Sequence, residues 1–201
     1  MIWLLGVSLA QAELPPPDYR DAVLGSVEAQ ADAMIQAGDL AGALNLVQEF
    51  RSEVASDARL AYEEGLIRRL QGDLAGAEQC YREAVQQDPK LFYAWYDLGE
   101  LLLQNGDLDG AEEALTQAFE QSAHHPQGWV APMRLAELAA QRGDAAAFDS
   151  WLKEAVRRGF RFATIAGTPA WMGYFSDPAL REVIERLATV YGEESVLETL
   201  Q

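Results

Sequence analysis

Basic residues and cysteine are scarce in this 201-residue sequence, and each scarcity excludes a class of function. Only 15 Lys and Arg stand against 32 Asp and Glu, which gives a net charge of −17. Nucleic acids and anionic membranes both require a basic surface, so neither is an expected partner. The single cysteine, Cys80, excludes an intramolecular disulfide and a cysteine-rich zinc site. We interpret it as a small packed residue.

Residues that could catalyse a reaction or bind a metal are also few. The two histidines, His124 and His125, are adjacent in a proline-containing stretch, so we interpret them as solvated loop residues. Neighbouring acids such as Glu63 and Glu64 would diverge around a helix instead of working as a catalytic acid and base, and are interpreted as a solvated face. No glycine-rich phosphate loop precedes a Gly-Lys-Ser/Thr triplet. We therefore expect no catalytic residue, cofactor or metal site, and a chain that is not an enzyme.

The first twelve residues, MIWLLGVSLAQA, carry no charged side chain. Their apolar run is shorter than the roughly 20 residues that span a bilayer, and Ala10-Gln11-Ala12 fits the pattern that precedes secretory cleavage. We expect residues 1–12 to be a signal peptide and residues 13–20 to be a proline-rich linker. Cleavage would leave a periplasmic or secreted chain without a stable membrane anchor. The run lacks a preceding Lys or Arg, so a cytoplasmic protein with an uncleaved apolar N-terminus stays the alternative.

A hexapeptide repeated at a fixed interval is the dominant feature. GDLAGA begins at Gly38 and again at Gly72, GDLDGA begins at Gly106, and both intervals are 34 residues. A weaker copy begins at Gly143. A period of 34 residues indicates a solenoid of helix pairs. In each copy, we expect the glycine to end one helix in the left-handed conformation and the following aspartate to cap the next helix.

The third unit predicts both helices of a pair. Asp88 is expected to cap its first helix, with Pro89 in the first turn. One face of this helix carries an apolar stripe at helical spacing, formed by Trp95, Leu98, Gly99 and Leu102. The second helix carries its own packing stripe of Ala111, Leu115 and Ala118.

These residues resemble the tetratricopeptide repeat, and the second unit adds further signature positions at Ala77, Tyr81, Ala84 and Pro89. The resemblance covers about residues 22–158. Its units are 21–54, 55–88, 89–125 and 126–158. It implies an all-α fold, a right-handed α-solenoid of about four helix-turn-helix pairs in which first helices line a concave groove. Residues 159–201 resemble the helical module that ends bacterial arrays of this family, and are expected to form a C-terminal cap and tail.

By analogy with the family, the groove residues are those on the first-helix faces beside the packing stripes. They are Tyr62, Glu63, Leu66, Arg69, Tyr93, Tyr96, Asp97, Glu100, Met133, Arg134 and Glu137. The tyrosines and the methionine offer anchoring area for a partner, and the acids surround it with negative charge. The alternative is that the tyrosines only cover neighbouring helices.

The resemblance therefore predicts a non-catalytic protein-protein interaction scaffold in the bacterial envelope. Its partner would be a peptide or protein that is not strongly acidic. A cytosolic adaptor or co-chaperone is the first alternative. An enzyme or a metal-binding protein is the distant one.

Overall fold

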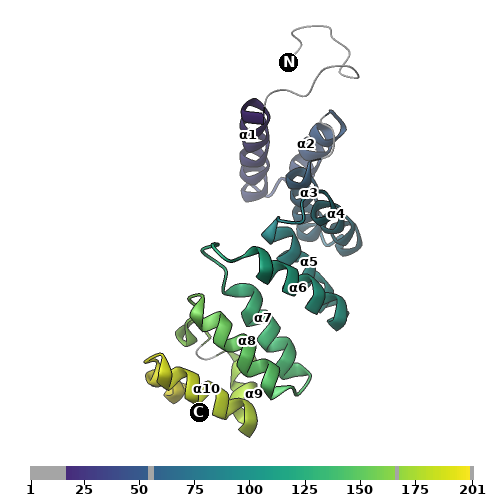
Figure 1. Ribbon diagram of the computed structural model, residues 1–201. Helices are drawn as coiled ribbons and strands as arrows, with labels where there is room; N and C mark the ends of the chain where they lie inside the picture. The colour runs from purple at the N-terminus through teal and green to yellow at the C-terminus, as the bar shows by residue number, and fades with distance from the viewer. Residues whose placement is uncertain (1–16, 54–56, 166–167, 200–201) are drawn as a thin grey trace, which may run out of the picture. The chain divides into compact units, whose positions relative to one another are not determined.

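The computed structural model describes residues 17–53, 57–165 and 168–199, and the regular structure within these ranges is entirely helical (Figure 1). The predicted all-α fold is confirmed. The α-helices are α1 (Pro17–Gln36), α2 (Leu40–Glu53), α3 (Ala58–Leu70), α4 (Leu74–Gln87), α5 (Phe92–Asn105), α6 (Leu108–Gln121), α7 (Val130–Gln141), α8 (Ala145–Arg157), α9 (Pro169–Ser176) and α10 (Pro178–Val190). Two short 3₁₀ helices accompany them, η2 (Phe162–Thr164) and η3 (Glu194–Thr199). The predicted signal peptide and the first part of the predicted linker lie outside the described residues.

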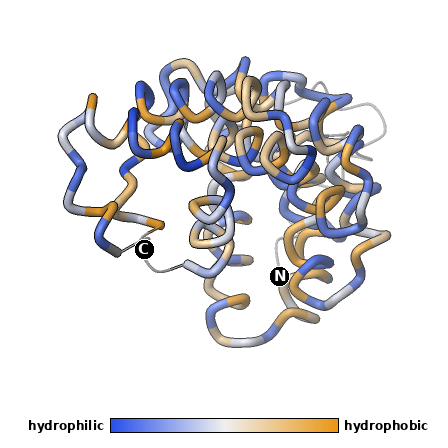
Figure 2. Tube along the Cα trace, turned by 90° about the horizontal axis from the view of Figure 1, so that it is seen from below, coloured by the Kyte–Doolittle hydropathy of each residue, from blue (hydrophilic) through white to orange (hydrophobic). Residues whose placement is uncertain are grey.

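The chain divides into two compact units, residues 1–94 and residues 95–201. In the first unit, α1 packs on α2, α2 on α3, and α3 on α4, while α1 also touches α3. In the second unit, α6 packs on α7, α7 on α8, and α10 on both α8 and α9. Hydrophobic and hydrophilic residues alternate along the helices at short intervals (Figure 2). Each helix therefore has an apolar side to bury against its neighbours.

The repeated hexapeptide forms the turn between the two helices of a pair, as predicted. Gly38, Gly72 and Gly106 have φ angles of 80°, 83° and 81°, which glycine adopts without steric cost. The aspartate that follows each glycine then caps the next helix. Its Oδ1 accepts a hydrogen bond from a backbone N–H three residues on, at 2.8 Å for Asp39 and 3.0 Å for Asp73. Asp107 and Asp144 cap α6 and α8 in the same way.

In two of the helix pairs, close approach depends on a glycine in the first helix. A Cβ added at Gly65 of α3 would lie 2.6 Å from the ring of Tyr81 on α4, and one added at Gly99 of α5 would lie 2.7 Å from Leu115 on α6. Tyr81 and Leu115 are fully buried. The predicted stripes of the third pair are buried at Leu98, Gly99, Leu102, Ala111, Leu115 and Ala118, while Trp95 is only half-buried.

The expectation that Asp88 caps α5 is wrong, because α5 begins only at Phe92. The backbone N–H of Asp88 donates to Ala84 at the end of α4, and its Oδ1 accepts from the N–H of Lys90 at 2.9 Å. This side-chain bond closes a local turn that contains Pro89. An Asp-Pro pair suits such a turn as well as it suits a helix start, and here the turn forms.

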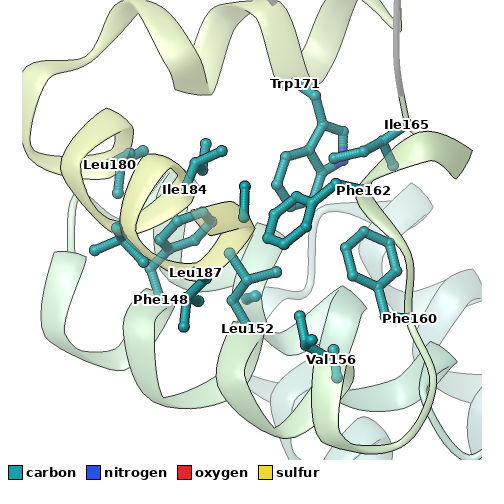
Figure 3. Packing of buried hydrophobic residues seen from close by; sticks show 14 of the residues in the cluster. Phe148, Leu152, Val156, Phe160, Phe162, Ile165, Trp171, Leu180, Ile184 and Leu187 are labelled. Atoms are coloured by element: carbon teal, nitrogen blue, oxygen red, sulfur yellow. The ribbon is translucent and has the colours of Figure 1, made fainter. Parts of the chain in front are cut away.

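Residues after α8 share one apolar core with that helix (Figure 3). Trp171 of α9 lies among the aromatic rings of Phe148, Phe160 and Tyr174, with centroid distances of 5.5–6.1 Å. Asp177 caps α10, because its Oδ1 accepts from the N–H groups of two residues in the first turn of that helix. The segment thus covers the apolar side of α8, which would otherwise face water.

Replacing Gly65 with Ala should lower the free energy of unfolding, because the new methyl group overlaps the buried Tyr81 ring. Overpacking costs about 1–3 kcal/mol, which exceeds the roughly 1 kcal/mol that alanine gains over glycine in a helix. Gly25→Ala is the matched control, since a Cβ added there in α1 meets no other atom within 4 Å. It should stabilise by up to about 1 kcal/mol. Urea unfolding followed by circular dichroism measures both, and equal effects would contradict the packing account.

Candidate protein-binding site

An aromatic cluster lies on the predicted binding face of the first unit. The ring centroid of Tyr62 on α3 lies 6.4 Å from that of Tyr93, in the first turn of α5, and 5.8 Å from that of Tyr81. Tyr81 is fully buried, Tyr62 is half-buried, and Tyr93 is 42% exposed. The cluster therefore extends from the core of the α3–α4 pair to the surface. Tyr62 covers a neighbouring helix, as the alternative interpretation holds, yet Tyr93 also offers aromatic area to solvent.

Glu63 lies next to this cluster in an unfavourable environment for a carboxylate. Its Oε2 atom is buried without a hydrogen-bond partner. Burial, followed by the negative charges of Asp32 and Glu28 on α1, raises the pKa of Glu63 to about 7. The remaining predicted residues of this unit, Leu66 and Arg69, are half-buried on α3. A positive charge brought to this position would stabilise the ionised Glu63.

The expectation that Glu63 and Glu64 form a solvated face is wrong, because Glu64 is only 6% exposed. It accepts hydrogen bonds from Gln48 of α2 at 3.0 Å and from Arg68 at 2.8 Å, and it pairs with Arg51 of α2. Burial alone would raise the pKa of Glu64. The bonds from Gln48 and Arg68 and the charge of Arg51 outweigh burial and hold that pKa below its usual range.

Arg51 extends the same network to a third helix, since its Nη2 lies 2.5 Å from Glu83 Oε1 on α4. Sequence reasoning missed this bridge. The pair of Glu64 and Arg68 was visible as a helical i,i+4 spacing. No spacing signals that a second-helix arginine reaches two helices of the next repeat. Glu64 is buried and bound by residues of the fold, so its carboxylate is not available to a partner.

On the second unit, Arg134 of α7 forms ion pairs with two acidic residues of the predicted face. Its Nε and Nη2 lie 2.8 Å and 2.9 Å from the two carboxylate oxygens of Glu100 on α5, and its Nη1 lies 2.6 Å from Glu137. Trp171 of α9 donates its Nε1–H to the other oxygen of Glu137 at 2.9 Å. The charges of Glu100 and Glu137 are therefore compensated inside the unit.

The other predicted residues of this face have different surroundings. Tyr96 is half-buried, and burial followed by the charge of Glu100 raises its pKa. Met133 packs against the apolar core that α8 shares with the C-terminal residues. Asp97 is buried, with 8% of its surface exposed. Of the predicted residues on this unit, the structure thus gathers Tyr96, Glu100 and Glu137 around Arg134, while Met133 packs against the apolar core and Asp97 is buried.

His125 and Cys80, which are of residue types that can catalyse reactions or bind metals, have structural surroundings that explain their positions. His125 lies in the loop between α6 and α7, where its Nδ1 accepts from the N–H of Gln127 at 3.1 Å. Cys80 is buried, and burial is the main cause that raises its pKa, which disfavours a reactive thiolate. Within the described ranges, no three His, Cys, Asp or Glu residues are grouped so that they could hold a metal ion.

These features define a class of protein, an all-α chain of helix pairs with polar and aromatic first-helix faces. Two models of the tetratricopeptide repeat match it, one over residues 28–91 and the other over residues 68–131, which together span just over half of the 201 residues. The chain belongs to the tetratricopeptide-repeat family. Repeats of this family are non-catalytic protein-interaction modules, which supports the expectation that the chain binds proteins and is not an enzyme.

Solved structures of other proteins show the same fold. PilF of Pseudomonas aeruginosa matches with a TM-score of 0.64 at 15% identity, over 90% of this chain and 90% of that one. MamA of Desulfovibrio magneticus RS-1 matches with a TM-score of 0.64 at 16% identity, over 86% of this chain and 95% of that one. The predicted α-solenoid class of fold is thereby confirmed. No curated protein matches the chain.

Among the described residues, no helix has both the length and the apolar character needed to cross a membrane.

Replacing Arg134 with Met should destabilise the second unit, because Glu100 and Glu137 would lose their counter-charge in a half-buried site. We expect a loss of roughly 1–3 kcal/mol, below the range for fully buried pairs because Arg134 is partly exposed. Arg82→Met on α4 is the control, since Arg82 is 47% exposed and pairs with its i,i+4 neighbour Glu78. That change should cost about 0.5 kcal/mol or less. Denaturant unfolding compares the two, and similar losses would argue against a structural role for Arg134.

Proposed function

We propose that the chain is a non-catalytic scaffold that binds a peptide segment of a protein partner on the first-helix faces of its repeats. The observation that carries this proposal is the aromatic pair of Tyr62 and Tyr93 beside the uncompensated Glu63. Tyrosines supply rigid contact area together with a hydroxyl group, and such residues dominate binding energy at protein interfaces. Family membership supports the same class of function.

The charges favour a partner that is not strongly acidic and that carries a basic residue near an apolar anchor. Glu100 and Glu137 are neutralised within the fold by Arg134. The negative charge available to a partner on these faces therefore gathers on α1 and α3, where Glu63 lies near Asp32 and Glu28. A lysine or arginine of the partner would relieve the repulsion there, while an acidic segment would add to it.

Replacing Tyr93 with Ala should reduce partner capture at least about tenfold, the loss expected for an interface hot spot. Affinity capture from lysate of the native cell in modest salt, with quantitative mass spectrometry, measures the retained partner. Tyr62→Ala tests the half-buried end of the pair in the same assay. The matched control is Tyr191→Ala, because Tyr191 is 39% exposed against 42% for Tyr93 and lies after α10.

The Tyr191→Ala control should capture as much partner as the native chain. Circular dichroism should show native helicity for each variant. Undiminished capture by a folded Tyr93→Ala protein would sink the proposed binding face.

We further propose that the protein acts in the bacterial envelope after export. The uncharged apolar segment before Ala10-Gln11-Ala12 supports this location, because it has the form of a secretory signal. The alternative is a cytosolic adaptor that keeps its first residues. Intact-mass spectrometry of the protein purified from its native cell should find a chain that starts at Glu13. A mass that includes residues 1–12 would favour the cytosolic alternative.

A further inference from the structure

Two kinds of contact hold α1 against α3 within the first unit. Leu24, Val27 and Ala31 of α1 share an apolar cluster with Leu60 and Ile67 of α3. Polar contacts supplement this cluster, because Arg59 Nη2 on α3 lies 2.8 Å from Asp21 Oδ1 on α1. The helix pair formed by α1 and α2 therefore depends on α3 for part of its burial.

One group opposes this attachment. Glu63 of α3 has a buried Oε2 without a hydrogen-bond partner, and the charges that act on it come from Asp32 and Glu28 of α1. Once Glu63 is ionised, like charges therefore act on each other across the contact between α1 and α3. Burial of the carboxylate adds to this cost, since no donor among the described residues replaces the water that Oε2 loses.

The other charged groups nearby are already engaged. Arg59, one turn before Glu63 on α3, is shared among Asp21, Asp57 and Glu28. From α2 and α4, Arg51 and Glu83 are bound to each other, and Arg51 is also bound to Glu64. These cations satisfy other carboxylates, and none of them is among the groups that set the titration of Glu63.

We propose that protonation of Glu63 latches α1 onto α3 and that its ionisation loosens α1, which makes the N-terminal helix pair sensitive to pH in the neutral range. Of the two helices, α3 carries part of the proposed binding face, and Asp32 and Glu28 of α1 act on Glu63 there, so the latch would also change the charge that this face presents. The latch itself is a property of the free chain and does not depend on a partner.

The direction of the effect follows from proton linkage. Below the ordinary pKa of 4.5, Glu63 is protonated in the folded and the unfolded chain alike, and there is no penalty. As the pH rises from there to about 7, the unfolded chain releases the proton while the folded chain retains it, so stability falls. Above about 7, both forms are ionised and the loss is complete.

Hydrogen–deuterium exchange of the full chain, corrected for intrinsic rates, tests the proposal at pH values on either side of neutrality, about 5.5 and about 8. The protection of amides in α1 should fall at least about tenfold in the native sequence as the pH rises, because a pKa of about 7 in place of 4.5 changes the equilibrium by more than that factor. Glu63→Gln, which cannot ionise, should show less than about a twofold fall.

The matched control is Glu49→Gln, because Glu49 is exposed on α2 of the same unit. It should keep the native pH dependence. Protection of α1 that stays flat in the native chain, or that falls equally in Glu63→Gln, would overturn the latch.

A second variant covers the case in which Glu63→Gln fails to fold. Asp32→Asn removes one of the two like charges that act on Glu63. The pH midpoint of the change in α1 protection should therefore move lower, while the fold stays the same. An unchanged midpoint would show that Glu63 does not control this contact.

Discussion

Close packing between the two helices of a repeat is the feature from which the others follow. In two of the pairs it requires a position without a side chain in the first helix, because Gly65 lies against Tyr81 and Gly99 lies against Leu115 with no room for a methyl group. Because that side of the first helix packs against the second helix of its pair, the polar and aromatic residues beside it lie on another face. Tyr62 and Tyr93 owe their position to this geometry. The candidate binding face is thus a consequence of how each pair packs.

Charge on these faces is less uniform than the net value of −17 implies. Arg51 in the first unit and Arg134 in the second unit each bind two carboxylates of their own unit. These acidic residues are therefore held in structural ion pairs. Glu63 stands out against this background, because no arginine of the described part of the chain is among the groups that set its titration, and burial is the main cause that raises its pKa to about 7. Glu63 is therefore an acidic residue of the candidate face whose buried Oε2 the fold leaves without a hydrogen-bond partner.

The sequence predicted the features that depend on neighbouring residues or on the repeat period. It did not predict the contacts between residues on different helices. The glycine turns and aspartate caps follow from backbone preferences within six residues, so the roles of Gly72 and Asp73 could be predicted from their neighbours in the chain. The role of Asp88 could not, because an Asp-Pro pair suits two local structures and packing selects one. Glu64 was misplaced for another reason. Its burial depends on Arg51, 13 residues earlier on another helix, and no helical spacing connects the two.

A partner that binds the first-helix faces should shield their backbone from solvent. A hydrogen–deuterium exchange footprint of the full chain, with and without its captured partner, measures that shielding helix by helix. We expect new protection in the first helices, within residues 58–70 and 92–105, with α4 and α8 unchanged. Protection confined to α4, α8 or α10 would contradict binding at these faces, because those helices do not carry the tyrosines and acids of the proposed face.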